Sequence, residues 1–215
     1  MDQNLPTKKT SKGTLYQSVY TNLRRRLLEG EWLPEAKLTL RGIAAELGTS
    51  AQPVREAINR LVAERVLLLR PNHCVMVPPV ERRMLDELWF LRMILESEAA
   101  RLCTPRLNRG DFRELDDSLR ELRHYYLQHR TSPKGRIRTT HRIPFLIAER
   151  SGSVQLKNEI EILRLRTAPY YAAAAASPKQ DAGFLTFSMQ LQEEFINALK
   201  RGDAEMAKDL WRASI

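Results

Sequence analysis

The sequence is poor in the residues that hold small secreted domains and cysteine-based metal modules together. Its 215 residues include two cysteines, Cys74 and Cys103, and neither belongs to a CxxC pair. We therefore expect no disulfide framework and no cysteine zinc module, but a reducing compartment. No apolar run approaches the roughly 20 residues that span a bilayer, and residues 1–13 are polar, without the apolar segment of a signal peptide. These features predict a cytoplasmic protein with no membrane partner, in which residues 1–13 form a flexible basic arm.

The motifs of the common enzyme classes are also absent. The chain has no Gly-rich phosphate loop, no GxSxG and no HExxH, and its four histidines are scattered. The sequence therefore does not indicate an enzyme. Two alternatives stay open at this point: an all-helical enzyme that binds a metal or a small molecule, and an RNA-binding protein.

Positive charge is in excess. The formal net charge is +9 and the sequence pI is about 9.8, and the excess per residue is largest toward the N-terminal end. This balance favours a polyanionic partner such as nucleic acid. With 43% hydrophobic and 28% charged residues, the chain has the composition of a packed globular protein, and its length suits two domains.

The first 78 residues show helical periodicity followed by strand patterns. The first helix has an apolar stripe of Leu15, Val19, Leu23 and Leu27 and ends at Gly30. Thr39 and Ser50 stand where the caps of the next two helices belong. The predicted elements are helices over 14–29, 40–47 and 51–65 and strands over 66–69 and 74–77. A short helix, a tight turn and a longer helix form a helix-turn-helix, and the hairpin that follows forms a wing.

In a helix-turn-helix the second helix enters the major groove with its N-terminal residues at the base edges. Arg bonds a guanine edge and Gln an adenine edge, which favours Gln52 and Arg55. The triplet Arg24-Arg25-Arg26 is either a solvated helix face or a phosphate contact, and beside this motif we favour phosphate contact. The predicted DNA-contacting residues are Arg24, Ala51, Gln52, Arg55 and, at the tip of the wing, Arg70 and His73.

The run LRGIAAELGTSAQPVREAINRLVAERVLLLRPNHCVMV resembles the winged-helix domain of the GntR family, above all in LGTS followed by PVREAI. The resemblance covers about residues 14–78, and it implies DNA contacts by Arg41, Gln52, Arg55 and His73. Some positions depart from the family. Ala51 stands where the family has a base-reading Arg, Gln52 where a Thr is usual, and Cys74, Glu35 and Arg65 where glycines are usual. We therefore expect an operator that differs from the common one.

After Pro79 the sequence becomes helical almost throughout. Turn signals such as Asn108-Arg109-Gly110 and Gly202 separate the helices, and Asp111 and Asp203 are expected N-caps. The predicted helices span 81–103, 111–130, 136–150, 153–176, 184–200 and 203–214. A bundle of this size can hold a ligand between its helices.

This half is similar to the C-terminal ligand-binding domain of the FadR-type GntR subgroup, an FCD-like domain. LRMILESEAARL contains Arg92 and Glu96 of the subgroup's opening helix, and two later segments match in order and spacing. Many members hold a divalent metal with one Asp and three His, and the metal fixes a carboxylate effector. Those ligand positions correspond here to Ile137, His141, Gln192 and Ser214. Since one imidazole, an amide and a hydroxyl are a poor set of donors for Zn or Ni, we expect no metal cofactor.

Without a metal, a buried carboxylate or phosphate needs cationic donors, and Arg is the usual choice. The candidate arginines are Arg92, Arg138, Arg142, Arg164 and Arg166, although a surface position is the simpler expectation for any one of them. His141 is either an effector donor or a core histidine. The predicted effector-contacting residues are Arg92, Arg138, His141, Gln192 and Ser214.

The expected protein is mainly α-helical. A winged helix-turn-helix with a small β-hairpin occupies residues 14–78, and an antiparallel bundle of about six helices for effector binding and dimerisation occupies 81–215. We expect a transcription regulator that acts as a repressor and as a homodimer on a palindromic operator in double-stranded DNA. A small-molecule effector, an organic acid or related metabolite, controls its affinity for DNA. The sequence leaves open the effector's identity, the operator, repression against activation, and any remaining metal role of His141.

Overall fold

The computed structural model describes residues 12–70, 74–127, 133–176 and 182–215 of the chain. It divides into two compact units, one of residues 1–26 and 35–78 and the other of residues 27–34 and 79–215. The segment 27–34 thus belongs to the second unit, although the sequence analysis placed it inside the first domain. Each unit has its own secondary structure and is described separately.

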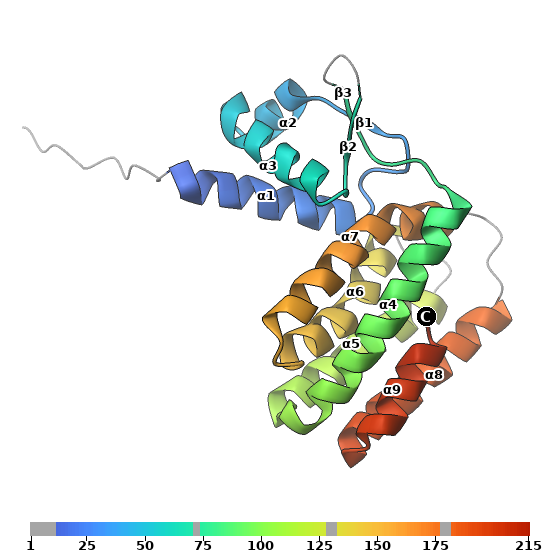
Figure 1. Cartoon of the computed structure of the whole chain (residues 1–215). Coiled ribbons are helices and arrows are strands. Elements are labelled where there is room, and N and C mark those ends of the chain that lie inside the picture. Colours follow the sequence, from blue (N-terminus) through green and yellow to red (C-terminus); the bar gives the residue numbers. More distant parts are fainter. Residues whose placement is uncertain (1–11, 71–73, 128–132, 177–181) are drawn as a thin grey trace, which may run out of the picture. The chain divides into compact units, whose positions relative to one another are not determined.

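The first unit contains three helices and a three-stranded sheet (Figure 1). Its elements are α1 (Lys12–Leu28), β1 (Lys37–Leu38), α2 (Leu40–Glu46), α3 (Ala51–Ala63), β2 (Leu68–Arg70) and β3 (Cys74–Met76). The three predicted helices are confirmed to within two residues at each end. The hairpin is confirmed as well, but the sheet also contains β1, which pairs antiparallel with β3 through Lys37 opposite Met76. Two residues are too short a run to show a period, so sequence patterning did not predict this strand.

The strand predicted over 66–69 begins too early, because Val66 and Leu67 belong to the turn that follows α3 and ends it. The amide of Val66 donates to the carbonyl of Leu61 at 2.9 Å, and that of Arg65 donates to Val62 at 2.9 Å. These two bonds form a Schellman motif, which places Arg65 in the left-handed region at φ 57°. Val66 and Leu67 are consequently buried beside the helix, and the strand starts at Leu68.

The caps of the helix-turn-helix follow the sequence only in part. Thr39 is confirmed as the N-cap of α2, since its Oγ accepts from the amide of Gly42 at 3.1 Å. Ser50 is the N-cap residue of α3, as predicted, but its side chain makes no capping hydrogen bond. Gly48 ends α2 at φ 60°, and the amide of Thr49 donates to Ala44 at 3.0 Å. This second Schellman motif turns the chain toward α3.

The core of the first unit lies between α1, α2, α3 and the sheet. The buried apolar residues are Val19, Tyr20, Leu23, Leu38, Ile43, Ala44, Val54, Ala57, Ile58, Leu61, Val66, Leu67, Val75, Met76 and Val77. Leu15 was predicted to lie on the inward stripe but is 37% exposed. Helical periodicity shows which side a residue faces, but it does not show how far the neighbouring elements extend along the helix.

The second unit is a bundle of six α-helices and one 3₁₀ turn among its described residues (Figure 1). They are α4 (Arg82–Cys103), η2 (Thr104–Arg106), α5 (Arg109–Leu127), α6 (Pro133–Arg150), α7 (Val154–Ala176), α8 (Ala182–Arg201) and α9 (Ala204–Ala213). Helix α4 packs against α6, α7 and α9, while α8 packs against α5 and α9. The six predicted helices and the mainly α-helical fold class are confirmed. No helix in the described ranges is long and apolar enough to cross a bilayer.

Two caps in the bundle show how the helices begin. Asp203 is confirmed as the cap of α9, accepting from the amide of Met206 at 3.0 Å. Asp111 is not the N-cap of α5, because α5 begins two residues earlier. Asn108 Oδ1 accepts from the amides of Gly110 and Asp111, and Asp111 accepts in return from the amide of Asn108 at 2.9 Å. This reciprocal pair is a capping box.

The left-handed conformation of Arg65 predicts a stabilising substitution. A side chain in this conformation costs about 1–2 kcal/mol, whereas glycine adds a smaller entropic cost of roughly 0.5–1 kcal/mol. Arg65→Gly is therefore expected to raise the free energy of unfolding by about 0.5–1 kcal/mol, as measured by urea denaturation. Arg55→Gly is the matched control, because Arg55 lies within α3, where glycine should lower stability by about 1 kcal/mol. Loss of stability in both variants would contradict the argument.

Candidate DNA-binding and effector sites

Three polar contacts fix the helix-turn-helix against α1. The hydroxyl of Tyr20 donates to Oε1 and Oε2 of Glu64 at 2.7 and 2.8 Å, just past the end of α3. The guanidinium of Arg60 lies 4.1 Å from the centre of the Tyr20 ring and bonds Glu64 at 2.9 Å. Burial and the bond to Glu64 raise the pKa of Tyr20 to about 12. Arg26 bonds Glu46 at 2.7 Å and so joins α1 to α2.

The burial of Arg26 contradicts the prediction that the whole basic triplet contacts phosphates. Arg26, the third residue of the basic triplet, is 8% exposed and holds α2 in place. It is therefore a structural residue and not a phosphate contact. Arg24 is half-buried, with its guanidinium 5.4 Å from the centre of the Tyr20 ring.

The N-terminal half of α3 presents a polar outer face over an apolar inner one. Ala51, Gln52 and Arg55 are exposed, and Gln52 Nε2 donates to Oε1 of Glu56 at 2.8 Å. On the inner face Pro53, Val54, Ala57 and Ile58 are buried. Since the inner face is fixed in the core, the exposed side chains project from a rigid helix.

Two further predicted DNA contacts are described elsewhere in the first unit. Arg41 is exposed on α2, and Arg70 is exposed at the end of β2, where its Nε lies 3.3 Å from the sulfur of Met76. His73 lies outside the described residues. Arg41, Gln52 and Arg55 all belong to the helix-turn-helix, and their exposure leaves them available to a ligand.

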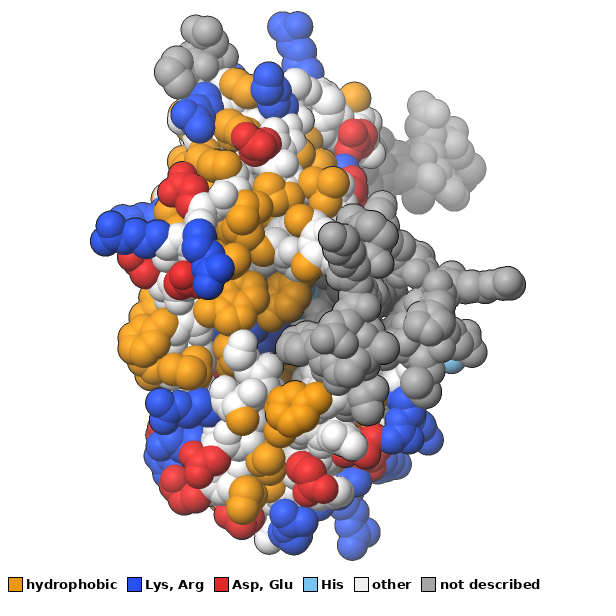
Figure 2. All heavy atoms as spheres, turned by 90° about the vertical axis from the view of Figure 1, so that its right-hand side faces the viewer, with side chains coloured by type: hydrophobic (Ala, Val, Ile, Leu, Met, Phe, Trp, Pro, Cys, Tyr) orange, Lys and Arg blue, Asp and Glu red, His pale blue; other side chains and the backbone are white. Residues whose placement is uncertain are grey.

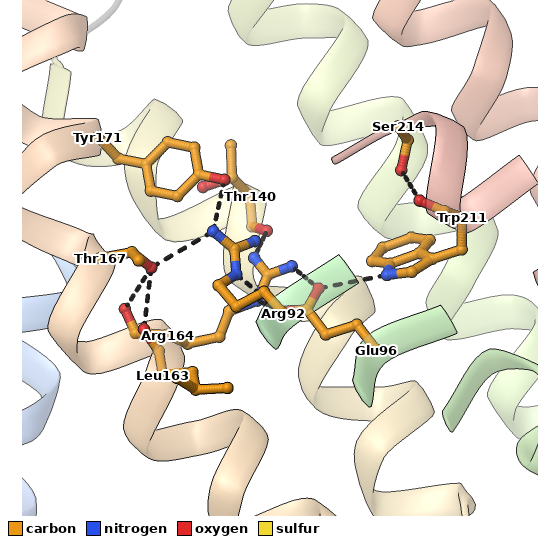
Figure 3. Close-up of polar contacts among 9 residues, drawn as sticks. All are labelled: Arg92, Glu96, Thr140, Leu163, Arg164, Thr167, Tyr171, Trp211 and Ser214. Atoms are coloured by element: carbon orange, nitrogen blue, oxygen red, sulfur yellow. Dashed lines mark hydrogen bonds and ion pairs between the residues drawn. The ribbon is translucent and has the colours of Figure 1, made fainter. Parts of the chain in front are cut away.

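The second unit contains a charged cluster in its interior (Figure 3). Glu96 on α4 is fully buried, Arg92 is 1% exposed and Arg164 on α7 is 4% exposed. Arg92 Nε and Arg164 Nε each donate to Glu96 Oε1 at 2.8 Å, and Arg164 Nη2 donates to Oε2. The indole N–H of Trp211 on α9 donates to the same Oε2 at 3.2 Å. One carboxylate thus joins three helices.

Neutral groups satisfy further donors of the two guanidiniums. Arg92 Nη1 donates to the hydroxyl of Tyr171 at 2.9 Å and to Thr167 Oγ1 at 3.3 Å. Arg164 Nη1 donates to the carbonyl of Thr140 at 3.3 Å. The cluster therefore contains two cations and one anion, and the other partners in these contacts are uncharged.

The pKa of Glu96 shows which of its surroundings dominates. Burial by itself raises the pKa of this carboxyl, but Arg164 and Arg92 outweigh burial and hold it at about 2. Burial and the like charge of Arg92 lower the pKa of Arg164, although Glu96 opposes that change. The carboxylate is therefore ionised at neutral pH, with two guanidiniums competing for it.

His141 on α6 lies beside this cluster and has an unusual environment. It is 3% exposed, and neither ring nitrogen has a hydrogen-bond partner among the described residues. The centre of its ring lies 5.8 Å from the ring centre of Phe145, in a stacked arrangement. It lies 6.1 Å from the ring centre of Tyr171, with the two rings nearly perpendicular. Burial, Arg164 and Arg92 lower its pKa well below the ordinary value, against Glu96. A buried imidazole with two unsatisfied nitrogens is rare in a protein interior and calls for a partner.

The other predicted effector residues differ in their surroundings. Gln192 on α8 has a buried Oε1 without a partner in the described part of the chain. Ser214 donates its hydroxyl to the carbonyl of Trp211 at 2.7 Å, so its proton is already used within the end of α9 (Figure 3). Arg138 is in α6, and its side chain lies outside the described residues. Arg142 bonds Glu121 at 2.8 Å as a partly exposed pair.

The four family positions for a metal do not fit one. Ile137 supplies no donor, Gln192 only a weakly coordinating amide, and Ser214 a hydroxyl bonded to the backbone. Burial and the positive charges of Arg164 and Arg92 lower the pKa of His141, and the field of these two cations also disfavours a divalent cation. In the described ranges, no three His, Cys, Asp or Glu residues lie close enough together to hold a metal ion.

The sequence indicated only some members of the charged cluster. Thr167 and Trp211 gave no signal, because nothing in the sequence shows that α7 and α9 bring them to α4. The polar pair Arg92 and Glu96 did carry a signal, since residues four apart share a helical face, and here that face also contains Leu88, Ala99 and Cys103, all buried.

The fold and these two sites define a class of protein: a winged-helix DNA-binding regulator with an all-helical effector-binding domain. Comparison with known protein families supports this class directly. Residues 15–77 match the family of bacterial regulatory proteins called gntR, and residues 87–215 match the FCD domain.

Known proteins similar to this chain are transcription regulators as well. The chain is 32% identical over 176 residues to the HTH-type transcriptional regulator McbR of Escherichia coli K12, covering 81% of this chain and 79% of McbR. It is 32% identical over 92 residues to the gluconate operon transcriptional repressor of Bacillus subtilis 168, covering 43% and 37% of the two chains. The solved structure of E. coli McbR/YncC has a TM-score of 0.82 at 28% identity, with 91% of each chain covered.

The chain belongs to the GntR family, in the group that carries an FCD domain. It is a transcription regulator and not an enzyme. Regulators of this family bind operator DNA through the winged helix and small-molecule effectors through the FCD domain.

Glu96 predicts a specific acid sensitivity. Its folded pKa of about 2 lies below the ordinary 4.5, so the stability it provides is present above about pH 4.5 and is lost as the pH falls toward 2. Glu96→Gln leaves two buried guanidiniums without their anion and is expected to lower the free energy of unfolding at pH 7 by about 3–5 kcal/mol. The deficit should shrink steadily between pH 4.5 and 2, as measured by denaturation across that range.

Glu98→Gln is the matched control on the same helix. Glu98 is partly exposed and bonds Arg101 and Lys208 at the surface, where such pairs contribute no more than about 1 kcal/mol. A deficit in the Glu96 variant that does not depend on pH would contradict an ionised carboxylate in the cluster.

Proposed function

We propose that this chain is a repressor that binds a palindromic operator in double-stranded DNA as a homodimer, and that a small organic acid bound in the second unit controls its affinity for DNA. It acts in the cytoplasm, where the chromosome lies. The observation that carries the proposal is the exposed start of α3, where Gln52 and Arg55 project from a helix whose other face is locked into the core.

The charges around the helix-turn-helix favour duplex DNA as the partner. Arg41 and Arg70 are exposed on other elements of the first unit. Lys and Arg that contact phosphates position a protein on DNA, whereas contacts to base edges give specificity. We therefore assign Arg41 and Arg70 to the DNA backbone and Gln52 and Arg55 to the bases. The methyl group of Ala51 has no hydrogen-bonding atom, so only an apolar contact is open to it.

The outer face of α4 supports a homodimer. Met84, Phe90, Leu91 and Ile94 are between 38% and 57% exposed and lie on the side of the helix opposite to Arg92 and Glu96. The charged residues of its first turns already pair with one another, as Arg82 does with Asp86 and Arg83 with Glu87. Hydrophobic side chains gather on the side of the molecule seen in Figure 2. Two copies of such a face bury each other in a symmetric contact.

Repression is supported by a relative. The Bacillus subtilis protein that matches 43% of this chain is called a repressor. An effector that binds better to the dimer geometry that does not fit the operator shifts the population toward it and releases DNA. The cationic cluster of Arg92 and Arg164 favours an acidic effector.

Operator binding tests the main proposal. An operator is first selected from a pool of random duplexes, and its affinity is then measured by fluorescence anisotropy. Arg55→Ala is expected to lower specific affinity by about 1–3 kcal/mol, or roughly 5- to 150-fold, because it removes a bidentate base contact. The control Arg113→Ala removes an exposed arginine of α5 and should leave affinity unchanged.

Two outcomes of this experiment would rule out DNA binding through α3. One is an unchanged affinity in the Arg55 variant. The other is equal binding to single-stranded RNA of the same length and salt, because an RNA-binding protein has no need of a recognition helix in a major groove.

A charge on the outer face of α4 should break the homodimer. Ile94→Glu is expected to shift the chain from dimer to monomer in sedimentation velocity, because two carboxylates would be buried at the symmetric contact. Its operator affinity should fall with the loss of the second half-site. Val154→Glu is the control: Val154 is 71% exposed at the start of α7, where an acidic residue is well tolerated. Dissociation of both variants, or of neither, would rule out this face.

A further inference from the structure

The residues around His141 conflict with the metal that the resemblance implies, and the conflict identifies what they bind. We propose that the second unit is a metal-free receptor for a small organic monoanion, with Arg92 and Arg164 supplying the positive charge and His141 a direct hydrogen bond to the ligand. This inference rests on the proposed effector control, and it names the charge of the effector and the way it is held.

The first argument is the charge of the buried cluster. Arg92 and Arg164 are 1% and 4% exposed and share the single carboxylate of Glu96. Their other described partners, the Tyr171 hydroxyl, Thr167 Oγ1 and the Thr140 carbonyl, are neutral. One positive charge is therefore left without a counter-ion in the described interior. An uncompensated buried charge is costly, and a ligand with one negative charge removes that cost.

The second argument is independent of charge. Both nitrogens of His141 are buried without a partner among the described residues, although His141 packs within 6.1 Å of the Tyr171 ring, whose hydroxyl accepts from Arg92. The imidazole is thus next to a side chain of the charged cluster and has hydrogen-bonding capacity that the protein does not use. An incoming carboxylate oxygen satisfies an imidazole N–H, and Phe145 and Tyr171 supply apolar surface for a short carbon chain.

The same residues exclude a divalent cation at this place. A metal would add two positive charges to a cluster that already has an excess of one. Of the four positions that the resemblance implies as ligands, only His141 offers a strong donor, and the hydroxyl of Ser214 already bonds the carbonyl of Trp211. The guanidiniums thus take over the role that a metal has in the resemblance, which is to attract a carboxylate. Arg suits this role because its planar fork matches a carboxylate.

Lactate, acetate and lactamide are suitable probes. The full chain is purified without a histidine tag, treated with a chelator, and studied by thermal unfolding and calorimetric titration at constant ionic strength set with sodium chloride. Lactate or acetate is expected to raise the melting temperature and to bind at one site per chain. The neutral lactamide should bind at least about tenfold more weakly, since it lacks the charge. Addition of zinc or nickel should not tighten lactate binding.

Two variants test the residues. Arg92→Gln removes the excess charge and should abolish carboxylate binding. Because that change affects a buried ion pair, His141→Phe is the second variant: His141 makes no described internal hydrogen bond, and a phenyl ring keeps the stack on Phe145. His141→Phe should weaken lactate binding by about tenfold without lowering the melting temperature of the free protein.

The outcomes separate this inference from the proposed function. One tightly bound metal per chain, with lactate binding only when the metal is present, would overturn the inference. Equal binding of lactate and lactamide, or no binding of either carboxylate, would overturn it too. Operator affinity is measured in the same preparations. If it is intact and depends on Arg55, the proposed DNA-binding function is retained even when the carboxylate-receptor inference is rejected.

Discussion

The carboxylate of Glu96 is the point on which the second unit depends. It accepts hydrogen bonds from Arg92 on its own helix, from Arg164 on α7 and from Trp211 on α9, and it is fully buried. A charge without water is stable only when its partners are held in place. The bundle must therefore keep three helices in register around two oxygen atoms. Hydrophobic packing alone, as in the neighbouring cluster of Ile147, Phe195 and Leu199, tolerates small shifts more easily than this contact does.

This constraint gives α4 an inverted pattern of polarity. Its inner face contains Arg92 and Glu96, while its outer face exposes Phe90, Leu91 and Ile94. In an isolated bundle such a helix would be unfavourable on both sides. Both sides become favourable when an anion completes the inner charge balance and a second subunit covers the outer face. The two proposals thus assign partners to the two faces of one helix, which places effector binding and dimerisation on the same rigid element.

In the first unit, the position of the exposed side chains of α3 depends on how α3 packs against α1 and α2. Tyr20, Arg60 and Glu64 link α1 to the end of α3, and Arg26 with Glu46 links α1 to α2. In the first turns of α3, Pro53 and Val54 are buried in the core, whereas Ala51, Gln52 and Arg55 stay exposed on the outer side, where Gln52 bonds Glu56. A recognition helix held in this way presents its side chains with little loss of conformational entropy on binding.

The helices, their order, the helix-turn-helix with its hairpin and the family could all be predicted from local sequence patterns. Periodicity, capping residues and a specific motif are local properties, and Thr39, Asp203 and the PVREAI segment carry them within a few residues. The sequence also showed that three of four family metal ligands are missing. Neither the short strand β1, the buried position of Arg26, nor the exposure of Leu15 followed from it. The contacts of Glu96 with Arg164 and Trp211 followed from the tertiary structure, because they connect residues 68 and 115 positions apart and their geometry depends on how whole helices pack. The same packing leaves both ring nitrogens of His141 without a hydrogen-bond partner among the described residues.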